Sequence, residues 1–143
     1  MKRVVVLFWA TVAAGFAVSP ATAIGAGIDK GMALEAAAEE WVSHLFQPGY
    51  NEFPLALFTA APFLAGAVFQ LFHLTAERVS PGRWAGMAGA LCAGMGLAVW
   101  VLVAIRTSRS STAGIGFLFV PFEVVVAMGI GYAAGRLVAR RAG

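Results

Sequence analysis

Long apolar runs separated by short polar segments dominate the chain. Residues 54–74, 84–105 and 113–135 each form a run of about 20 residues with no internal Lys, Arg or Asp. At about 1.5 Å per helical residue, such a run matches the roughly 30 Å hydrocarbon layer of a bilayer. The connections, residues 75–83 and 106–112, are short and rich in turn-forming residues, so consecutive helices should be antiparallel neighbours. The pattern predicts an all-α membrane protein with a bundle of three transmembrane helices.

The N-terminal apolar run, residues 4–18, is shorter than the others. It has about 15 residues, whereas a spanning helix needs about 20. It follows the basic pair Lys2-Arg3 and precedes Pro20, which should break the helix, and the small residues Ala21-Thr22-Ala23. A basic end, a short apolar helix and a site of small residues are typical of a signal peptide. We therefore expect cleavage after Ala23. The alternative is that residues 1–23 stay on the protein as a fourth transmembrane helix.

The next segment, residues 24–53, has a different composition and is expected to lie outside the cell membrane. Its acidic residues are Asp29, Glu35, Glu39, Glu40 and Glu52, against the single base Lys30. A helix beginning near Gly31, with Asp29 as its cap, would be amphipathic. Its apolar face would carry Leu34, Ala38, Trp41 and Leu45. This helix either lies along the outer membrane interface or is a solvated connector that packs on its own bundle.

Composition and charge agree with a membrane location. Of 143 residues, 60% are hydrophobic and 12% are charged, about half the charge of a soluble domain. This excludes a disordered segment, a secreted disulfide scaffold and a soluble nucleic-acid binder. Basic residues mark the cytoplasmic side. With the C-terminus inside, that side receives Lys2, Arg3, Arg78, Arg83, Arg136, Arg140 and Arg141. We expect a multi-pass protein of a bacterial inner membrane with a basic cytoplasmic tail.

Small residues recur at every fourth position in two of the runs. The first ladder is Gly82, Gly86, Ala90, Gly94 and Ala98, and the second is Ala127, Gly131, Gly135 and Ala139. Small side chains let helix backbones approach closely in lipid, where no hydrophobic effect drives association. The predicted packing residues are Gly86, Ala90, Gly94, Gly131 and Gly135. Their partner helix lies either in the same chain or in another subunit.

Glu123 is the acidic residue inside the last run. It lies about 15 Å along the helix from Ala113, which predicts a position near the bilayer midplane. A carboxyl group there must be protonated, paired or in contact with water. Pro121 should kink the helix and leave the Phe117 carbonyl free nearby. Glu123 is therefore a candidate intramembrane proton or ion site. Alternatively, it is protonated and hydrogen-bonded to a neighbouring helix. The candidate polar partners are Thr59, Gln70 and His73.

Arg106 and Arg109 form a basic pair on the expected outer side, with no local acid to neutralise them. Their guanidinium groups, beside the free N–H groups of a helix that begins near Ser110 to Thr112, make a candidate contact for an anion or a lipid phosphate. The stretch Ser110-Ser111-Thr112-Ala113-Gly114-Ile115 and the following Phe119-Val120-Pro121 resemble a pattern in small uncharacterised bacterial multi-pass inner-membrane proteins. The resemblance implies a membrane protein and brings no activity with it.

Candidate chemistry elsewhere is sparse. Glu40 and His44 have the spacing of an ordinary helical ion pair, and the sequence carries no nucleophile and base set, phosphate loop or metal-ligand set. We expect no enzyme activity, cofactor or metal. The sequence favours a small structural or accessory membrane protein, whose partners are the lipid bilayer and a homo-oligomer or a larger membrane complex, not nucleic acid. The alternative is an oligomeric proton- or ion-coupled transporter or channel that uses Glu123.

Overall fold

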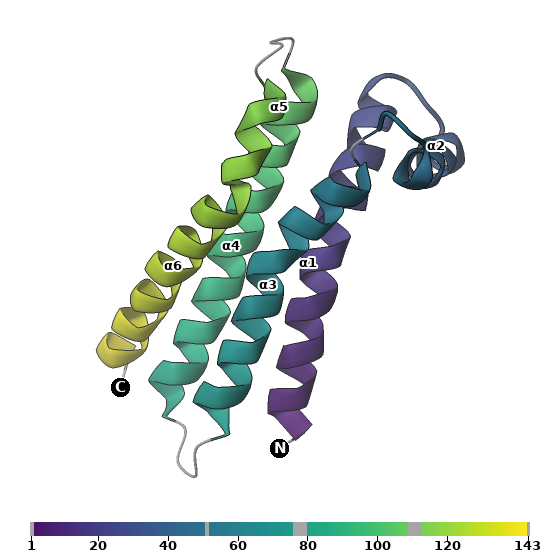
Figure 1. The fold of residues 1–143 in the computed structure, drawn as a ribbon. Coiled ribbons are helices and arrows are strands. Elements are labelled where there is room, and N and C mark those ends of the chain that lie inside the picture. The colour runs from purple at the N-terminus through teal and green to yellow at the C-terminus, as the bar shows by residue number, and fades with distance from the viewer. Residues whose placement is uncertain (1, 51, 76–79, 109–112, 143) are drawn as a thin grey trace.

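The computed structural model describes residues 2–50, 52–75, 80–108 and 113–142, and the regular elements in these ranges are helices (Figure 1). They are α1 (Lys2–Asp29), α2 (Leu34–Phe46), α3 (Glu52–Leu74), α4 (Pro81–Thr107), α5 (Ala113–Gly116), the short 3-10 helix η1 (Phe117–Phe119) and α6 (Val120–Ala142). The expected all-α class is confirmed. Among the described residues, α1, α3, α4 and α6 are long and apolar enough to cross a membrane.

The four long helices form two antiparallel pairs. α1 packs mainly on α3, and α4 packs mainly on α6, while contacts of α1 with α4 and of α3 with α6 join the pairs. Both termini lie at one end of the bundle, and α2 and α5 lie at the other (Figure 1). We call the end with α2 and α5 the outer end, and the end with the termini the inner end.

The N-terminal helix continues past the point where the sequence predicted a break. α1 contains Pro20 and ends at Asp29, so it is long enough to span a membrane. Proline removes one backbone hydrogen bond, but packing against neighbouring helices tolerates this loss in membrane helices. Val18 and Ser19, just before the proline, are fully buried in the bundle. The described structure thus has four candidate spans, where the sequence favoured three and a signal peptide.

The last apolar run is not one uninterrupted helix over 113–135. A 3-10 turn, η1, separates the single turn α5 from α6. Pro121 lies in the first turn of α6, where a missing N–H is not needed by the helix. α6 then continues to Ala142, so the basic tail is helical. As a result, Glu123 lies in the first turn of this span, whereas the sequence placed it near the middle of its helix.

Phe63 of α3 is at the centre of the core and is completely buried. Small residues leave room for its ring. A Cβ atom added to Gly15 of α1 would lie 2.6 Å from the Phe63 Cβ, and one added to Gly94 of α4 would lie 3.5 Å from the ring. In contrast, Trp9, Trp100 and Phe122 are largely exposed on the outside of the bundle. An apolar surface of this kind is expected where the surrounding solvent is lipid.

The α4–α6 pair has the closest backbone contact. A Cβ atom on Gly131 would collide with the carbonyl oxygen of Gly89, and one on Gly135 would collide with that of Ala85. The predicted ladder residues Gly86 and Gly94 also face α6, where they contact the side chains of Tyr132 and Met128. The ladder residue Ala90 is buried in the same core.

The outer helix α2 begins later than expected. Asp29 is the last residue of α1, and the N-cap of α2 is Ala33, which makes no side-chain capping hydrogen bond. The prediction that Asp29 caps α2 is therefore wrong. Gly31 explains the difference, because its φ of 89° lies in the left-handed region that ends helices and reverses the chain. α2 packs on α1 through Ala37, which a Cβ atom on Gly27 would touch at 2.9 Å.

Candidate functional site

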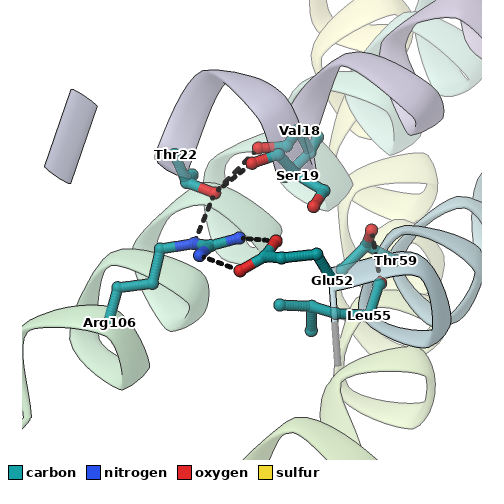
Figure 2. Close-up of polar contacts among 7 residues, drawn as sticks. All are labelled: Val18, Ser19, Thr22, Glu52, Leu55, Thr59 and Arg106. Carbon is teal, nitrogen blue, oxygen red and sulfur yellow. Dashed lines mark hydrogen bonds and ion pairs between the residues drawn. The ribbon is translucent and has the colours of Figure 1, made fainter. Parts of the chain in front are cut away.

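A polar junction joins three helices at the outer end of the bundle (Figure 2). Arg106, in the last turn of α4, donates two parallel hydrogen bonds to Glu52, in the first turn of α3. The Nη1–Oε1 distance is 2.7 Å and the Nη2–Oε2 distance is 2.8 Å. The two side chains are only 13% and 16% exposed. A two-point arginine–carboxylate pair in such a sheltered place is one of the stronger polar contacts that proteins make.

Thr22 of α1 completes this junction. Its hydroxyl oxygen accepts a hydrogen bond from Arg106 Nε at 3.3 Å. The threonine's own hydrogen is donated to its helix backbone, where the carbonyl oxygens of Val18 and Ser19 lie at 2.9 Å and 3.0 Å. Arg106 therefore holds α1 and α3 to the end of α4 (Figure 2).

The helix ends favour this arrangement. A carboxylate near a helix N-terminus and a cation near a helix C-terminus each interact favourably with the helix dipole, and Glu52 and Arg106 occupy those positions. No acid that could neutralise Arg106 was evident from the local sequence, because Glu52 lies 54 residues away. The available signal was the antiparallel order of α3 and α4, which brings the start of one helix to the end of the next.

This pairing changes what Arg106 can do. Both terminal nitrogens and Nε are directed to Glu52 and Thr22, so the residue acts here as an internal clamp. A contact with an anion stays a prediction. Arg109, its expected companion, lies outside the described residues.

A pocket of about 300 Å³ opens beside the junction, between α1, α2 and the start of α3. Its charged lining consists of Lys30, Glu40, Glu52 and Arg106. Trp41 also lines it, and its Nε1 atom is buried with no hydrogen-bond partner among the described residues. The pocket thus offers charges of both signs, which can bind a polar side chain or a zwitterionic headgroup.

The expected ion pair between Glu40 and His44 is not formed. The His44 ring instead stacks on Tyr50, with 3.8 Å between ring centroids and an angle of 11° between the planes. Tyr50 follows the turn at Gly49, whose φ of 94° bends the chain back toward α2. This stack ties the C-terminal end of α2 to the segment that leads into α3.

Glu123 is separate from this junction. It is exposed on the α4–α6 surface, where it borders shallow pockets with Trp100 and Ala104 of α4 and with Phe122 beside it. Its surroundings are therefore the outside of the bundle in the outer half of α4, and not a cavity between the four helices.

The candidate partners of Glu123 make their polar or ring contacts elsewhere. The Thr59 hydroxyl lies 3.0 Å from the carbonyl oxygens of both Leu55 and Ala56 in its own helix. His73 stacks on Phe69, with 4.7 Å between ring centroids.

Gln70, the third candidate partner, binds Thr11 of α1, at 2.9 Å between Oε1 and the threonine oxygen. The structure thus uses Gln70 to join α1 and α3.

Comparison with known proteins adds no assignment. No protein-family model, no curated protein and no solved structure matches the chain. The resemblance of residues 110–121 to small bacterial inner-membrane proteins therefore stays a prediction.

Proposed function

We propose that this chain is a small structural or accessory protein of a bacterial inner membrane, and that its outer helix α2 binds a partner protein. The observation that carries the proposal is the outward surface of α2. Leu34, Val42 and Phe46 are 63%, 53% and 79% exposed there. Ala37 packs α2 on α1, and the His44–Tyr50 stack ties the C-terminal end of α2 to the segment that leads into α3. A rigid support with an exposed apolar surface is suited to holding a partner.

The charge of α2 favours a protein over the lipid surface as its partner. Helices that lie on membranes are typically rich in Lys and Arg on their polar face, which are attracted to anionic lipids. α2 contains Glu35, Glu39 and Glu40 and no Lys or Arg. Anionic headgroups would repel these carboxylates. A partner surface with apolar and basic residues would match both features of the helix.

We also propose that α1 remains on the mature protein as the first of four spans. Its contacts support this, because Thr11 binds Gln70 and Thr22 binds Arg106. Cleavage after Ala23 would remove both contacts. With four spans, both termini lie on one side of the membrane. The basic residues at the two termini make that side the cytoplasm by the positive-inside rule.

The fate of α1 can be tested with a protein that carries a different tag at each end. We expect one membrane species that has both tags, with a C-terminal fluorescent protein that matures only in the cytoplasm giving full signal. N-terminal sequencing that finds a mature chain beginning at Ile24 would support the signal peptide instead. A C-terminal reporter active only in the periplasm would invert the orientation.

The partner proposal predicts the result of purification in mild detergent followed by mass determination. The parent protein should be recovered in a complex with a second protein. Phe46→Ser should abolish this complex, because it removes the most exposed apolar side chain of α2. Phe72→Ser is the matched control, since Phe72 is 78% exposed but lies at the inner end of α3. Equal recovery of the complex from both variants, or recovery of homo-oligomers alone, would contradict the proposal.

The second candidate function is proton- or ion-coupled transport by an oligomer. The exposed position of Glu123, in the first turn of α6, favours it, because a carboxylate on a lipid-facing surface is unfavourable unless something covers it. A second copy on the α4–α6 surface would supply that cover. In the same mass measurement, this function requires a homo-oligomer in which Glu123→Gln keeps the assembly and abolishes flux. If Glu123 has no such role, Glu123→Gln should leave both the assembly and the flux unchanged.

A further inference from the structure

An apolar groove of about 330 Å³ runs between α3 and α6. On α6 its lining extends from Val125 to Tyr132, seven residues or about 10 Å along the helix. Phe69 of α3 and Gly129 of α6 belong to the lining and are exposed, so the groove opens to the surface that faces lipid. α3 and α6 contact each other less than the helices of either main pair do, which leaves this space between them.

Each of these helices places a basic side chain one turn beyond an aromatic residue of the groove. His73 follows Phe69 by four residues on α3, and Arg136 follows Tyr132 by four residues on α6. Residues four apart lie on the same face of a helix. Both helices run from the outer end to the inner end (Figure 1). His73 and Arg136 therefore lie together at the inner end of the groove.

Ring contacts hold the two basic side chains against the groove walls. The His73 ring stacks on Phe69, with 4.7 Å between ring centroids, and meets the edge of the Tyr132 ring at 6.0 Å. The Arg136 guanidinium carbon lies 5.8 Å from the centroid of the same Tyr132 ring. These contacts bring the imidazole of α3 and the guanidinium of α6 to one aromatic ring that itself lines the groove.

The nitrogen atoms of His73 and Arg136 are accessible to a ligand. Both side chains are partly exposed. Neither makes a hydrogen bond or an ion pair in the described part of the chain, and their nitrogen atoms are not buried. Guanidinium and imidazole N–H groups are hydrogen-bond donors. The inner end of the groove thus presents unused donors, one of which carries a permanent positive charge.

The surrounding charge is also positive. Arg136 is followed by Arg140 and Arg141 in the last turn of α6. The acidic residues of the described chain lie at the outer end or in the first turn of α6. An anionic headgroup is therefore attracted to the inner end and meets no described carboxylate there.

We propose that the groove binds an anionic phospholipid of the bilayer, with one acyl chain along α3 and α6 and the phosphate at Arg136 and His73. Arginine donates two parallel hydrogen bonds to a phosphate, and the histidine N–H donates one more. The apolar lining suits an acyl chain, and basic pockets between spans bind anionic headgroups. A choline headgroup adds a cation beside three arginines, so a zwitterionic lipid binds less tightly. This site lies at the other end of the bundle from Arg106.

Two matched pairs of variants separate the headgroup contact from the acyl-chain contact. Arg136→Gln removes the charge at the groove, and Arg141→Gln removes the same charge from an exposed position on the same helix. Gly129→Phe fills the groove, because Gly129 lines it and a Cβ atom added there meets no atom within 4 Å. Gly96 of α4 has the same free surroundings outside the groove lining, so Gly96→Phe is its control.

The test is native mass spectrometry of the purified full-length protein in non-ionic detergent, titrated with dioleoyl-phosphatidylglycerol or dioleoyl-phosphatidylcholine. Phosphatidylglycerol should bind the parent and Arg141→Gln about tenfold more tightly than phosphatidylcholine, which corresponds to one charge-assisted contact. Arg136→Gln should reduce this preference to about twofold. Gly129→Phe should weaken both lipids about tenfold relative to Gly96→Phe, because the chain loses its groove.

Thermal unfolding of each variant checks that it is folded. If Arg136→Gln is not folded, His73→Phe decides, because it keeps an aromatic ring on Phe69 and removes the N–H donor. It should weaken phosphatidylglycerol about two- to tenfold.

Four results would overturn the proposal. Equal binding of the two lipids by the parent excludes recognition of negative charge. An equal loss of preference in Arg136→Gln and Arg141→Gln means that the basic tail attracts lipid without a defined site. Equal binding by Gly129→Phe and Gly96→Phe excludes the groove. Competition by oleate that is as strong as competition by phosphatidylglycerol means that any anionic amphiphile is bound and that the phosphate is not recognised.

Discussion

Gly131→Leu should prevent α4 and α6 from packing and should give a protein that aggregates on extraction. The reason is the backbone contact at this position, where any Cβ atom on Gly131 meets the carbonyl oxygen of Gly89 and lies 2.6 Å from the Ala93 Cβ. Backbone atoms cannot rotate away as a side chain can. The destabilisation should therefore exceed the roughly 1–3 kcal/mol that is typical of overpacking a core. Size-exclusion chromatography and thermal aggregation in detergent measure it.

Leu substitutions at two other glycines should have smaller effects. Gly96→Leu is the matched control, because its Cβ atom meets nothing within 4 Å, and its aggregation temperature should stay close to that of the parent. Gly94→Leu should be intermediate, since it meets the Met128 side chain at 2.7 Å and a methionine can adopt another rotamer. Equal aggregation temperatures for Gly131→Leu and Gly96→Leu would mean that α4 and α6 do not pack through this surface.

The packing of these helices could be predicted only in part. The ladder of small residues in α4 includes Gly86 and Gly94, which face α6 in the structure, but it does not include Gly89, where an added Cβ atom would collide with the Gly131 carbonyl oxygen. A four-residue spacing defines one stripe on one helix. The register between two helices depends on the surfaces of both, and here the bulky Tyr132 and Met128 occupy the positions opposite Gly86 and Gly94, which leaves Gly89 opposite Gly131.

The effect of the prolines on the helix boundaries could also be predicted only in part. The sequence treated Pro20 as the end of a helix, but α1 continues through it. Pro121 was expected to kink a helix that began at Ala113, and instead it lies in the first turn of a new helix after η1. A proline always removes one hydrogen bond. Whether the helix then continues depends on the tertiary contacts on both sides, and Val18, Ser19 and Thr22 are buried around Pro20.

The candidate site was the least predictable part of the molecule. Arg106 was identified as unusual because it lacked a neighbouring acid, and this observation was sound at the level of local sequence. Its partner Glu52 lies in another helix. The two parallel hydrogen bonds of the pair depend on the position of α3 relative to α4 along the bundle axis. Glu123 attracted attention as an acid in an apolar run, but the contacts of Thr59, Gln70 and His73 show that chemical type alone does not select partners.

Removing either member of the Arg106–Glu52 pair should destabilise the bundle, and removing both should cost less than the sum of the two single losses. Arg106→Met leaves the Glu52 carboxylate in a place where it is 16% exposed and has lost its two strongest donors. Breaking a fully buried pair costs about 3–5 kcal/mol, and partial exposure reduces this, so we expect about 2–4 kcal/mol in the free energy of unfolding. Glu52→Gln, which leaves the guanidinium unpaired, should lose a similar amount.

The double variant Arg106→Met with Glu52→Gln separates the ion pair from the packing of its side chains. It has no isolated charge at the junction, so its loss should be smaller than the sum of the two single losses by about 1–3 kcal/mol. Thr22→Val is a further control, because it keeps both charges and removes the hydroxyl that accepts from Arg106 Nε at 3.3 Å and donates to its own helix backbone. It should cost about 1 kcal/mol. Denaturant unfolding of all four variants in one mixed micelle provides the cycle. Strict additivity would mean that Arg106 and Glu52 do not stabilise each other, and that α1, α3 and α4 are held at the outer end by their apolar contacts alone.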